Sequence, residues 1–310
     1  MVEIELKIVN LKMECAMLKF KFMYIVLVLF TSLMLSANQS IELKKDLPSL
    51  IGYSWLKKHI ENPKLVIIDV RKNALYLKGH LQNAVNLPTF KKLFDKELFM
   101  PKLDVLKETF SSAGIDDESL VVVYDNGDFI WAARCYWLLE VLGHKNVGLL
   151  ADSYDVLKEL KFQTTTDTFH PIKKDFIPMI NNEMIETKLS TLVGINKKTI
   201  IDGRPKEYYD GLKSSAKRYG HIKSALNYPG SENSIKFQDG RHILNIDELG
   251  KHYHKLDKKK PIILYCMDGA DAAMNYIVLK ELGYKASVYE AGWLEWGNDE
   301  SLPIEDPAKR

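Results

Sequence analysis

The sequence predicts an α/β protein made of two copies of one domain, each a parallel sheet flanked by helices. Three observations predict it: repeated segments, short apolar runs rich in β-branched residues, and helical stretches that end at glycine. The chain of 310 residues is long enough for two ordinary domains. Its 46% content of hydrophobic residues is that of a globular protein with real cores.

Three pairs of segments resemble one another and follow the same order in both halves of the chain. The pairs are VIIDVR at 66–71 with TIIDGR at 199–204, GHLQNAVNLP at 79–88 with GHIKSALNYP at 220–229, and VVVYD at 121–125 with IILYC at 262–266. The spacing also agrees, because 39 residues separate the asparagine of the second segment from the last residue of the third in both copies. This agreement predicts domains at residues 48–158 and 183–303, joined by a linker at 159–182.

The same segments indicate how each domain is built. Continuous apolar runs predict buried strands of a parallel sheet covered on both faces, at Val66–Val70, Leu120–Tyr124, Ile200–Asp202 and Ile262–Tyr265. Helices are expected at Trp131–Leu142 and Ala272–Leu282, and each is followed by a glycine that suits a left-handed C-cap, Gly143 or Gly283. Strands that alternate with helices are typical of an α/β domain.

The N-terminal segment is expected to be a targeting signal and not part of the fold. An apolar run of thirteen residues, Met23–Leu35, follows Lys19 and Lys21 and precedes the small residue Ala37. A basic flank, a short apolar run and a small-residue exit describe a secretory signal, and about twenty residues are needed to span a bilayer. We expect residues 1–37 to be cleaved and the protein to be periplasmic or secreted. An uncleaved membrane anchor is the alternative, and is the only membrane contact expected.

The charge balance and the histidines limit the classes of partner and cofactor that the sequence predicts. Forty-three Lys and Arg face forty-one Asp and Glu, so the net charge of +2 gives no argument for binding nucleic acid. The loose cluster of His242, His252 and His254 lacks the cysteine or carboxylate spacing of a metal site. The sequence therefore indicates small-molecule partners, with neither a metal nor another cofactor.

Cys266 is the residue whose setting indicates chemistry. The other cysteines are Cys15, in the N-terminal segment, and Cys135, inside a predicted helix; no C-x-x-C pair is present. Cys266 stands where a buried strand ends and a helix begins, which is the edge at which α/β sheets bind ligands. A short loop there can turn its amide N–H groups toward the sulfur and lower the pKa of the thiol. We therefore predict that Cys266 is a nucleophile and that Cys135 is a core residue.

The Gly-His-[Leu/Ile]-x-x-Ala-x-Asn-x-Pro segments, the Asp-x-Arg strand ends and the Cys266 loop resemble the tandem-domain rhodanese and mercaptopyruvate sulfurtransferase family over about residues 48–300. The resemblance implies two rhodanese-like domains, of which only the second is catalytic; Asp125 at the position matching Cys266 fits this. It also implies that Cys266 takes a sulfur from thiosulfate or 3-mercaptopyruvate as a persulfide. A thiol or cyanide would then accept that sulfur.

The resemblance further implies which residues hold the sulfur and its donor. Arg204, at the Asp-x-Arg strand end, would bind the donor's anionic group, and Arg218 is a second candidate. Because Arg71 repeats Arg204 in the first domain, a structural salt bridge is an equal alternative, and the repeated His80 and His221 are expected to be structural. The sulfur would lie among the backbone N–H groups of the loop residues Met267, Asp268, Gly269, Ala270 and Asp271.

Two acidic residues set this loop apart from the family pattern of a cation or small neutral residues. A carboxylate of Asp268 or Asp271 about 4 Å from the sulfur would oppose a thiolate by on the order of 4 kcal/mol at an effective dielectric of about 20. Unless these side chains point to solvent, a catalytically impaired binding or scaffold protein is the alternative. A phosphatase is a poor fit, because Ala272 stands where it would need an arginine, and redox exchange lacks a resolving cysteine.

Overall fold

A computed structural model describes residues 47–309. These residues belong to one compact unit, and the signal predicted for residues 1–37 lies outside them. None of the helices in the described part of the chain has the length and hydropathy needed to cross a lipid bilayer.

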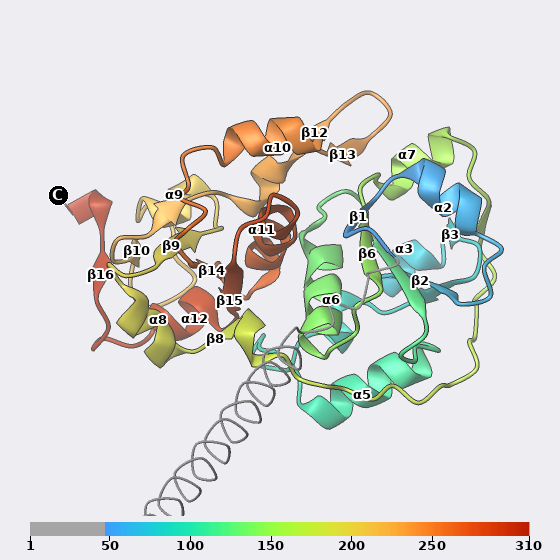
Figure 1. The fold of residues 1–310 in the computed structure, drawn as a ribbon, viewed down its shortest axis with the longest axis horizontal. Helices are drawn as coiled ribbons and strands as arrows, with labels where there is room; N and C mark the ends of the chain where they lie inside the picture. The colour runs from blue at the N-terminus through green and yellow to red at the C-terminus, as the bar shows by residue number, and fades with distance from the viewer. Residues whose placement is uncertain (1–46, 310) are drawn as a thin grey trace, which may run out of the picture. The chain divides into compact units, whose positions relative to one another are not determined.

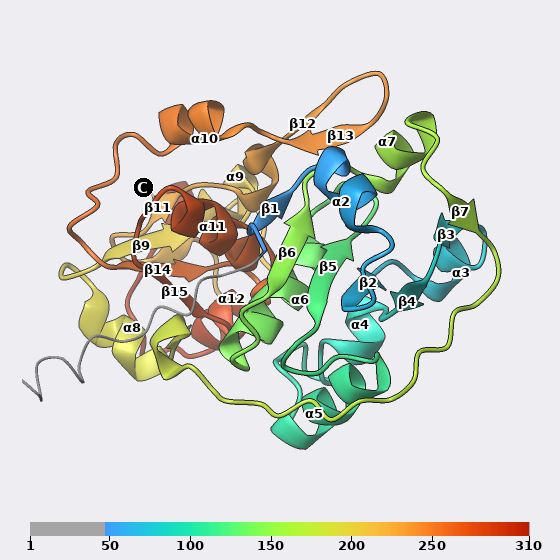
Figure 2. The same ribbon diagram turned by 45° about the vertical axis from the view of Figure 1, so that its right-hand side comes forward.

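The first domain contains a five-stranded parallel sheet with the strand order β1-β6-β5-β2-β4 (Figures 1 and 2). Its elements are β1 (Leu50–Ile51), α2 (Tyr53–His59), β2 (Leu65–Asp69), α3 (Asn73–Tyr76), β3 (His80–Leu81), β4 (Ala84–Asn86), α4 (Thr89–Lys92), α5 (Leu103–Ser112), β5 (Leu120–Tyr124), α6 (Ile130–Val141), β6 (Val147–Leu150), α7 (Tyr154–Glu159) and β7 (Thr164–Thr165).

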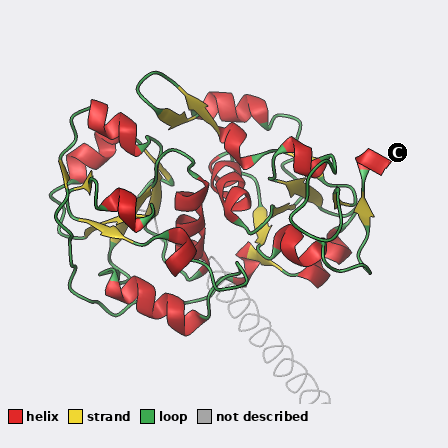
Figure 3. Cartoon of the chain, turned by 180° about the vertical axis from the view of Figure 1, so that it is seen from behind, coloured by secondary structure: helices red, strands yellow, loops and turns green. Residues whose placement is uncertain are grey.

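The second domain repeats this sheet as β11-β9-β14-β15-β8, again with all strands parallel. Its elements are η1 (Asn182–Met184), β8 (Ile185–Glu186), α8 (Lys188–Gly194), β9 (Thr199–Asp202), α9 (Lys206–Tyr209), β10 (His221–Ile222), β11 (Leu226–Asn227), η2 (Gly230–Asn233), β12 (Ser234–Lys236), β13 (Arg241–Ile243), α10 (Ile246–His252), β14 (Ile262–Tyr265), α11 (Ala270–Glu281), β15 (Ala286–Tyr289), α12 (Gly292–Trp296), β16 (Ile304–Glu305) and η3 (Pro307–Lys309). Seen from behind, helices flank the strands of both domains (Figure 3).

The predicted α/β fold with two repeated domains is confirmed. The strands predicted at Leu120–Tyr124 and Ile262–Tyr265 have the predicted bounds. The two predicted helices begin one or two residues earlier than predicted. Both helices are followed by glycines in the left-handed region, with φ of 88° at Gly143 and 79° at Gly283.

Alternate residues of each central strand face different cores. In β5, Val121 and Val123 face a core shared by both domains, whereas Val122 and Tyr124 pack against a smaller core under α2 and α7. The shared core contains α6 and α11, which pack against each other between the two sheets (Figure 1). Both helices are apolar on nearly all sides, as expected for helices buried by neighbours all round.

A hairpin of the second domain adds to this interface. Strands β12 and β13 reach the end of β6 in the first domain, where the Ile243 N–H donates to the Ala151 carbonyl at 2.9 Å and the Ser153 N–H donates to the Arg241 carbonyl at 3.0 Å. The shared core and this hairpin fix the position of the first domain beside the carboxyl end of β14.

The segment between β7 and η1 has no helix or strand. It runs along the first domain, where the Lys174 N–H donates to the Ser111 carbonyl at 3.0 Å and the Met179 N–H to the Leu142 carbonyl at 2.8 Å. This segment lies within the linker predicted at residues 159–182.

Candidate active site at the carboxyl end of β14

The repeated motifs form one hydrogen-bonded network in each domain. In the first domain the Arg71 guanidinium binds Asp69 at 2.6 Å and donates to the Gly79 carbonyl at 2.8 Å, while the Tyr124 hydroxyl donates to Asp69 at 2.6 Å. Asn86 donates to the carbonyls of Asp69 and Arg71, both at 2.9 Å. The network joins strand ends β2, β4 and β5 to the Gly-His turn.

The second domain contains the same network at the edge of the Cys266 loop. Arg204 binds Asp202 at 2.5 Å and donates to the Gly220 carbonyl at 2.7 Å, and the Tyr265 hydroxyl donates to Asp202 at 2.7 Å. The Asn227 amide donates to the Asp202 carbonyl at 3.0 Å. Tyr265 therefore anchors the end of β14 immediately before Cys266.

The two repeated histidines belong to the same scaffold. His80 stacks on Tyr76 with ring centroids 3.5 Å apart, and His221 stacks on Tyr209 at 3.7 Å. In each pair the histidine Nδ1 lies within hydrogen-bonding distance of the carbonyl oxygen of its stacking tyrosine. Since both copies have the same contacts, these histidines serve the fold, as expected from their repetition.

The loop after β14 turns one amide directly onto the sulfur. The Gly269 N–H donates to Cys266 Sγ at 3.1 Å, and Gly269 has a φ of 87°, which favours glycine. Helix α11 then begins at Ala270, so its N-terminal end lies beside the sulfur. Cys266 is fully buried, with 0% of its surface exposed.

The other side of the loop is held by the N-terminus of α12. The Cys266 carbonyl accepts from the Trp293 N–H at 2.8 Å, and the Met267 carbonyl accepts from the Leu294 N–H at 3.3 Å. Gly292 makes this possible, because a side chain there would place a carbon 2.5 Å from the Cys266 carbonyl oxygen. With its first two carbonyls bonded outward, the loop is free to point amides inward.

The charges around the sulfur act against its ionisation. Burial raises the pKa of the Cys266 thiol well above its usual value, and the charges of Asp268 and Asp271 raise it further. Backbone amides, including that of Ala272, act in the opposite direction but do not outweigh them. The direction is opposite to the one predicted from the loop amides and the helix end, so that prediction is wrong for the protein at rest.

Asp268 lies beside the sulfur, the charge of Asp271 also acts on it, and both residues are half-buried. Asp268 Oδ1 is 3.9 Å from Cys266 Sγ and also accepts from the Ala270 N–H at 3.3 Å. Burial raises the pKa of Asp268. Burial, with the charges of Asp268 and Asp202, raises the pKa of Asp271 to about 7. Both side chains therefore hold a proton more readily than an ordinary aspartate.

The matching loop of the first domain holds a carboxylate in place of the sulfur. Asp125 accepts hydrogen bonds from the N–H groups of Gly127 at 2.7 Å, Phe129 at 3.1 Å and Ala132 at 3.2 Å. Burial raises the pKa of Asp125 to about 6 even though these bonds favour its ionised form. The loop of the first domain thus has amides turned inward in the same manner.

The family of the protein follows from comparison of this chain with known proteins. The rhodanese-like domain family matches residues 53–160 and again residues 186–299. The chain belongs to the rhodanese family. It is 28% identical over 277 residues to the 3-mercaptopyruvate sulfurtransferase of Escherichia coli K12, a match that covers 82% of this chain and 97% of the relative. It is also 28% identical over 273 residues to a thiosulfate sulfurtransferase of Pseudomonas aeruginosa, covering 84% of this chain and 98% of the relative.

A solved structure supports the same assignment. The crystal structure of the 3-mercaptopyruvate sulfurtransferase from E. coli matches with a TM-score of 0.69 at 26% identity, over 79% of this chain and 99% of that one. The protein is therefore a rhodanese-family sulfurtransferase.

The two arginines predicted to bind the donor are both engaged with the protein. Arg204 is 1% exposed and bound to Asp202 in the same way as its counterpart Arg71, although its Nη1 has no hydrogen-bond partner among residues 47–309. Arg218 donates to the carbonyls of Trp296 at 2.6 Å and Leu302 at 2.8 Å, so it binds the chain around the end of α12. Donor binding by either arginine stays a prediction.

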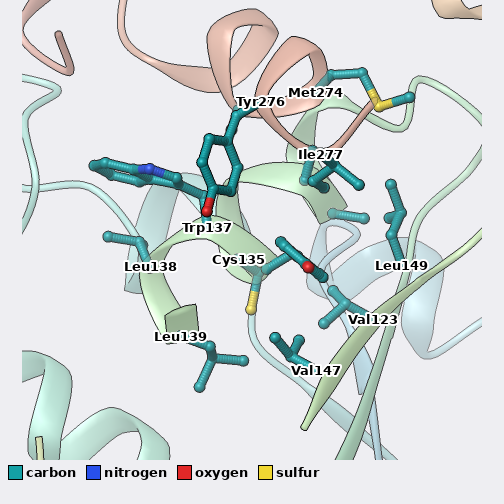
Figure 4. Packing of buried hydrophobic residues seen from close by; sticks show 14 of the residues in the cluster. Val123, Cys135, Trp137, Leu138, Leu139, Val147, Leu149, Met274, Tyr276 and Ile277 are labelled. Carbon is teal, nitrogen blue, oxygen red and sulfur yellow. The ribbon is translucent and has the colours of Figure 1, made fainter. Parts of the chain in front are cut away.

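Cys135 is buried like Cys266 but lies in the middle of a helix, away from the loop amides and carboxylates that surround Cys266. It lies among apolar side chains of α6, β5, β6 and α11 (Figure 4), and burial alone raises the pKa of its thiol. Both cysteines of the described chain are free thiols. The position of Cys135 in the core agrees with its prediction as a packing residue.

The histidines of the loose cluster have separate contacts. His242 lies 3.0 Å from Asp152 and 3.2 Å from Asp239, whereas His252 lies 3.8 Å from Glu232. Across residues 47–309, no three His, Cys, Asp or Glu side chains are grouped as metal ligands would be.

Two charged residues near the sulfur escaped the sequence analysis. Arg134 of α6 is completely buried and donates through Nη2 to Glu290 Oε1 at 2.5 Å. Glu290 directly follows β15. No repeat or motif marks either residue, and α6 and α11 must pack together before the pair reaches the loop.

Proposed function

We propose that this protein moves a sulfane sulfur from thiosulfate or 3-mercaptopyruvate to a thiol or cyanide acceptor through a persulfide on Cys266. The single observation that carries the proposal is the Gly269 amide directed at Cys266 Sγ from 3.1 Å, at the start of α11. An anionic sulfur is stabilised by such an N–H group and by a helix N-terminus. The names of the two sulfurtransferase relatives support these two donors.

The first step in this proposal is the loss of the thiol proton. Cys266 lies within reach of Asp268, whose raised pKa makes its carboxylate a stronger base than usual. Transfer of the proton from Sγ to Asp268 leaves a thiolate beside a neutral acid. The repulsion between that carboxylate and an anionic donor is removed at the same time.

The thiolate then takes the sulfur. It attacks the outer sulfur of thiosulfate, a new S–S bond forms, and the old one breaks with its electron pair leaving on sulfite. With 3-mercaptopyruvate the broken bond is C–S, and the electron pair leaves as the enolate of pyruvate, which takes up a proton. Either donor leaves Cys266 with one additional, anionic sulfur.

An acceptor completes the cycle. Cyanide attacks the outer sulfur and leaves as thiocyanate, or a thiolate attacks it and leaves as a persulfide; in both cases the Cys266 thiolate is restored. Because Cys266 is fully buried, access for donor and acceptor requires movement of the chain that covers the loop.

Intact mass spectrometry tests the proposal. Wild-type protein incubated with thiosulfate or 3-mercaptopyruvate should gain the mass of one sulfur atom and lose it on addition of cyanide. Cys266→Ser should gain nothing, whereas Cys135→Ser, the matched control at a buried cysteine, should load as wild type does. If neither donor loads the wild type, the proposal is wrong.

A catalytically impaired binding or scaffold protein is the second candidate. The raised pKa of Cys266 and its complete burial favour this alternative. In that case the thiol should remain unmodified by both donors well into alkaline solution, and Cys266→Ser should behave like the wild type.

We also propose that the chain is exported to the periplasm or secreted, on the basis of the basic flank and apolar run before Ala37. Amino-terminal sequencing of protein from fractionated cells should give a mature chain that begins at Asn38. A chain that keeps its N-terminal segment in the membrane fraction would favour the anchor.

A further inference from the structure

One arginine crosses from the first domain to the loop that carries the sulfur. Arg134 belongs to α6, and 0% of its surface is exposed. Its Nη2 binds Glu290 of the second domain at 2.5 Å. This ion pair thus joins the two domains next to the Cys266 loop.

The rest of the guanidinium lies against the loop itself. A methyl group added to Gly269 would lie 2.6 Å from Arg134 Nη1, so this nitrogen contacts the residue whose amide reaches the sulfur. The guanidinium carbon lies 4.4 Å from the centroid of the Phe94 ring and 5.6 Å from that of Trp137. These rings hold the cation in place from the side of the first domain.

Two of the three nitrogens of the Arg134 guanidinium are unused. Its Nε and Nη1 are buried and have no hydrogen-bond acceptor anywhere in residues 47–309. A buried donor without an acceptor costs on the order of 1 to 3 kcal/mol, and nearly all buried polar groups are satisfied. Donors kept free at this cost, beside a nucleophile, indicate a position for negative charge.

The charges around the loop also indicate that Arg134 faces a position for negative charge. The ionisable groups around it are Asp268 and Asp271 within the loop, Glu290 after β15, Asp202 with Arg204 at the end of β9, and Arg134 from the first domain; Asp95, also of the first domain, acts on Glu290. Arg204 is paired with Asp202 at the end of its own strand, although its Nη1 also lacks a hydrogen-bond partner within residues 47–309. Arg134 is the cation whose charge reaches the loop from the first domain, because it lowers the pKa of both Asp268 and Glu290.

We propose that Arg134 is a positioning residue that supplies, from the first domain, the positive charge needed to hold an anionic sulfur on Cys266. The inference rests on the proposed function and extends it. The cation comes from the neighbouring domain and approaches an acidic loop. The two domains must then be docked for the thiolate or the persulfide to be stable.

The test follows the ionisation of Cys266 and not turnover. Arg134→Met introduces the residue that stands at the matching position of α11, Met274, and removes the charge. The thiolate absorbance near 240 nm is titrated in wild type and variant, each corrected by the same protein with Cys266→Ser. We expect the midpoint to rise by at least one pH unit in Arg134→Met, which is about a tenfold loss of thiolate at a given pH. Arg134→Lys should lie between the two.

A double variant distinguishes an effect of Arg134 on the sulfur from its effect on Glu290. Arg134→Gln with Glu290→Gln replaces both charges by amides, so no unpaired carboxylate is left. If Arg134 serves the sulfur, this protein also shows the tenfold loss of thiolate, and adding Asp268→Asn restores part of it. A wild-type midpoint in the double variant would overturn the inference, because Arg134 would then serve Glu290 alone.

The same double variant replaces Arg134→Met if that protein does not fold. Failure of the proposed function remains distinguishable, because the midpoint can shift in a protein that accepts no sulfur from either donor. Conversely, a protein that is loaded by a donor while its midpoint is unaffected by Arg134 would disprove only the inference.

Discussion

The loops after β5 and β14 both turn amides inward. They differ in the group that these amides surround and in how well that group is hydrogen-bonded. Asp125 accepts three backbone N–H groups, whereas the Cys266 sulfur accepts the Gly269 N–H and lies 3.9 Å from a carboxylate. In the first domain three N–H groups satisfy the buried carboxylate, although burial still raises its pKa to about 6. In the second the loop maintains a group whose burial and surroundings are unfavourable, as is common where function competes with stability.

From this contrast we expect Asp125 to matter for stability and Cys266 to matter for chemistry. Asp125→Ala should lower the free energy of unfolding by about 3 kcal/mol, because three buried amides lose a charged acceptor and only part of this is offset by removal of a buried carboxylate. Cys266→Ala should change the same quantity by less than about 1 kcal/mol while it abolishes persulfide formation. Urea denaturation and intact mass measurement give both values.

The comparison would fail if the effects were reversed or equal. Folded Asp125→Ala should still load sulfur on Cys266, since the first loop has no part in the chemistry. Loss of loading in a protein that is folded at the assay temperature would mean that the first loop contributes to the site.

The two Asp-x-Arg networks offer a sharper comparison, because their geometry is the same in both domains. Arg71→Lys and Arg204→Lys should each lower the free energy of unfolding by about 2 kcal/mol, since lysine keeps the charge but loses the forked hydrogen bonds to Asp69 or Asp202. If both arginines are structural, sulfur loading per folded molecule is unchanged in both variants.

Donor binding would appear as a difference between these two proteins. A KM for the donor that rises at least tenfold in Arg204→Lys but not in Arg71→Lys would assign Arg204 to the anionic group. Equal KM values would remove Arg204 from the donor site and leave the salt bridge as its whole role.

The repeated parts of the molecule could be predicted from sequence because they have local signatures. A continuous apolar run such as Leu120–Tyr124 predicts a buried strand, and Gly143 predicts the end of the helix before it. The repeated segment pairs then predict that the second domain has the same fold as the first. The Cys266 loop was predicted by its place after a strand for the same reason.

The electrostatics of the site could not be predicted in this way. The pKa of Cys266 depends on the depth of burial and on where Asp268 and Asp271 point, neither of which a loop sequence specifies. Arg134 and Gly269 are 135 positions apart in the chain and meet only because α6 packs on α11. The carbonyls around the end of α12 that Arg218 binds are likewise not marked in the sequence around Arg218.

The smallest expected effect concerns Asp271, which packs against the backbone of Gly203 and Gly230. Its pKa of about 7 exceeds the usual 3.8, so the folded protein binds this proton more tightly than the unfolded chain does. Stability contributed by the protonated form is therefore complete below pH 4 and declines as the pH rises toward 7. A three-unit shift corresponds to at most about 4 kcal/mol, and partial exposure reduces it.

Asp271→Asn should consequently match the wild type at pH 4 and be more stable by about 1 to 2 kcal/mol at pH 8. Urea denaturation across this range measures the difference, with Asp104→Asn on the exposed surface of α5 as a control for the change in net charge. A gain that is the same at pH 4 and pH 8 would show that Asp271 titrates normally. The acidic loop would then impose no pH-dependent cost, and the contrast with the Asp125 loop would rest on hydrogen bonds alone.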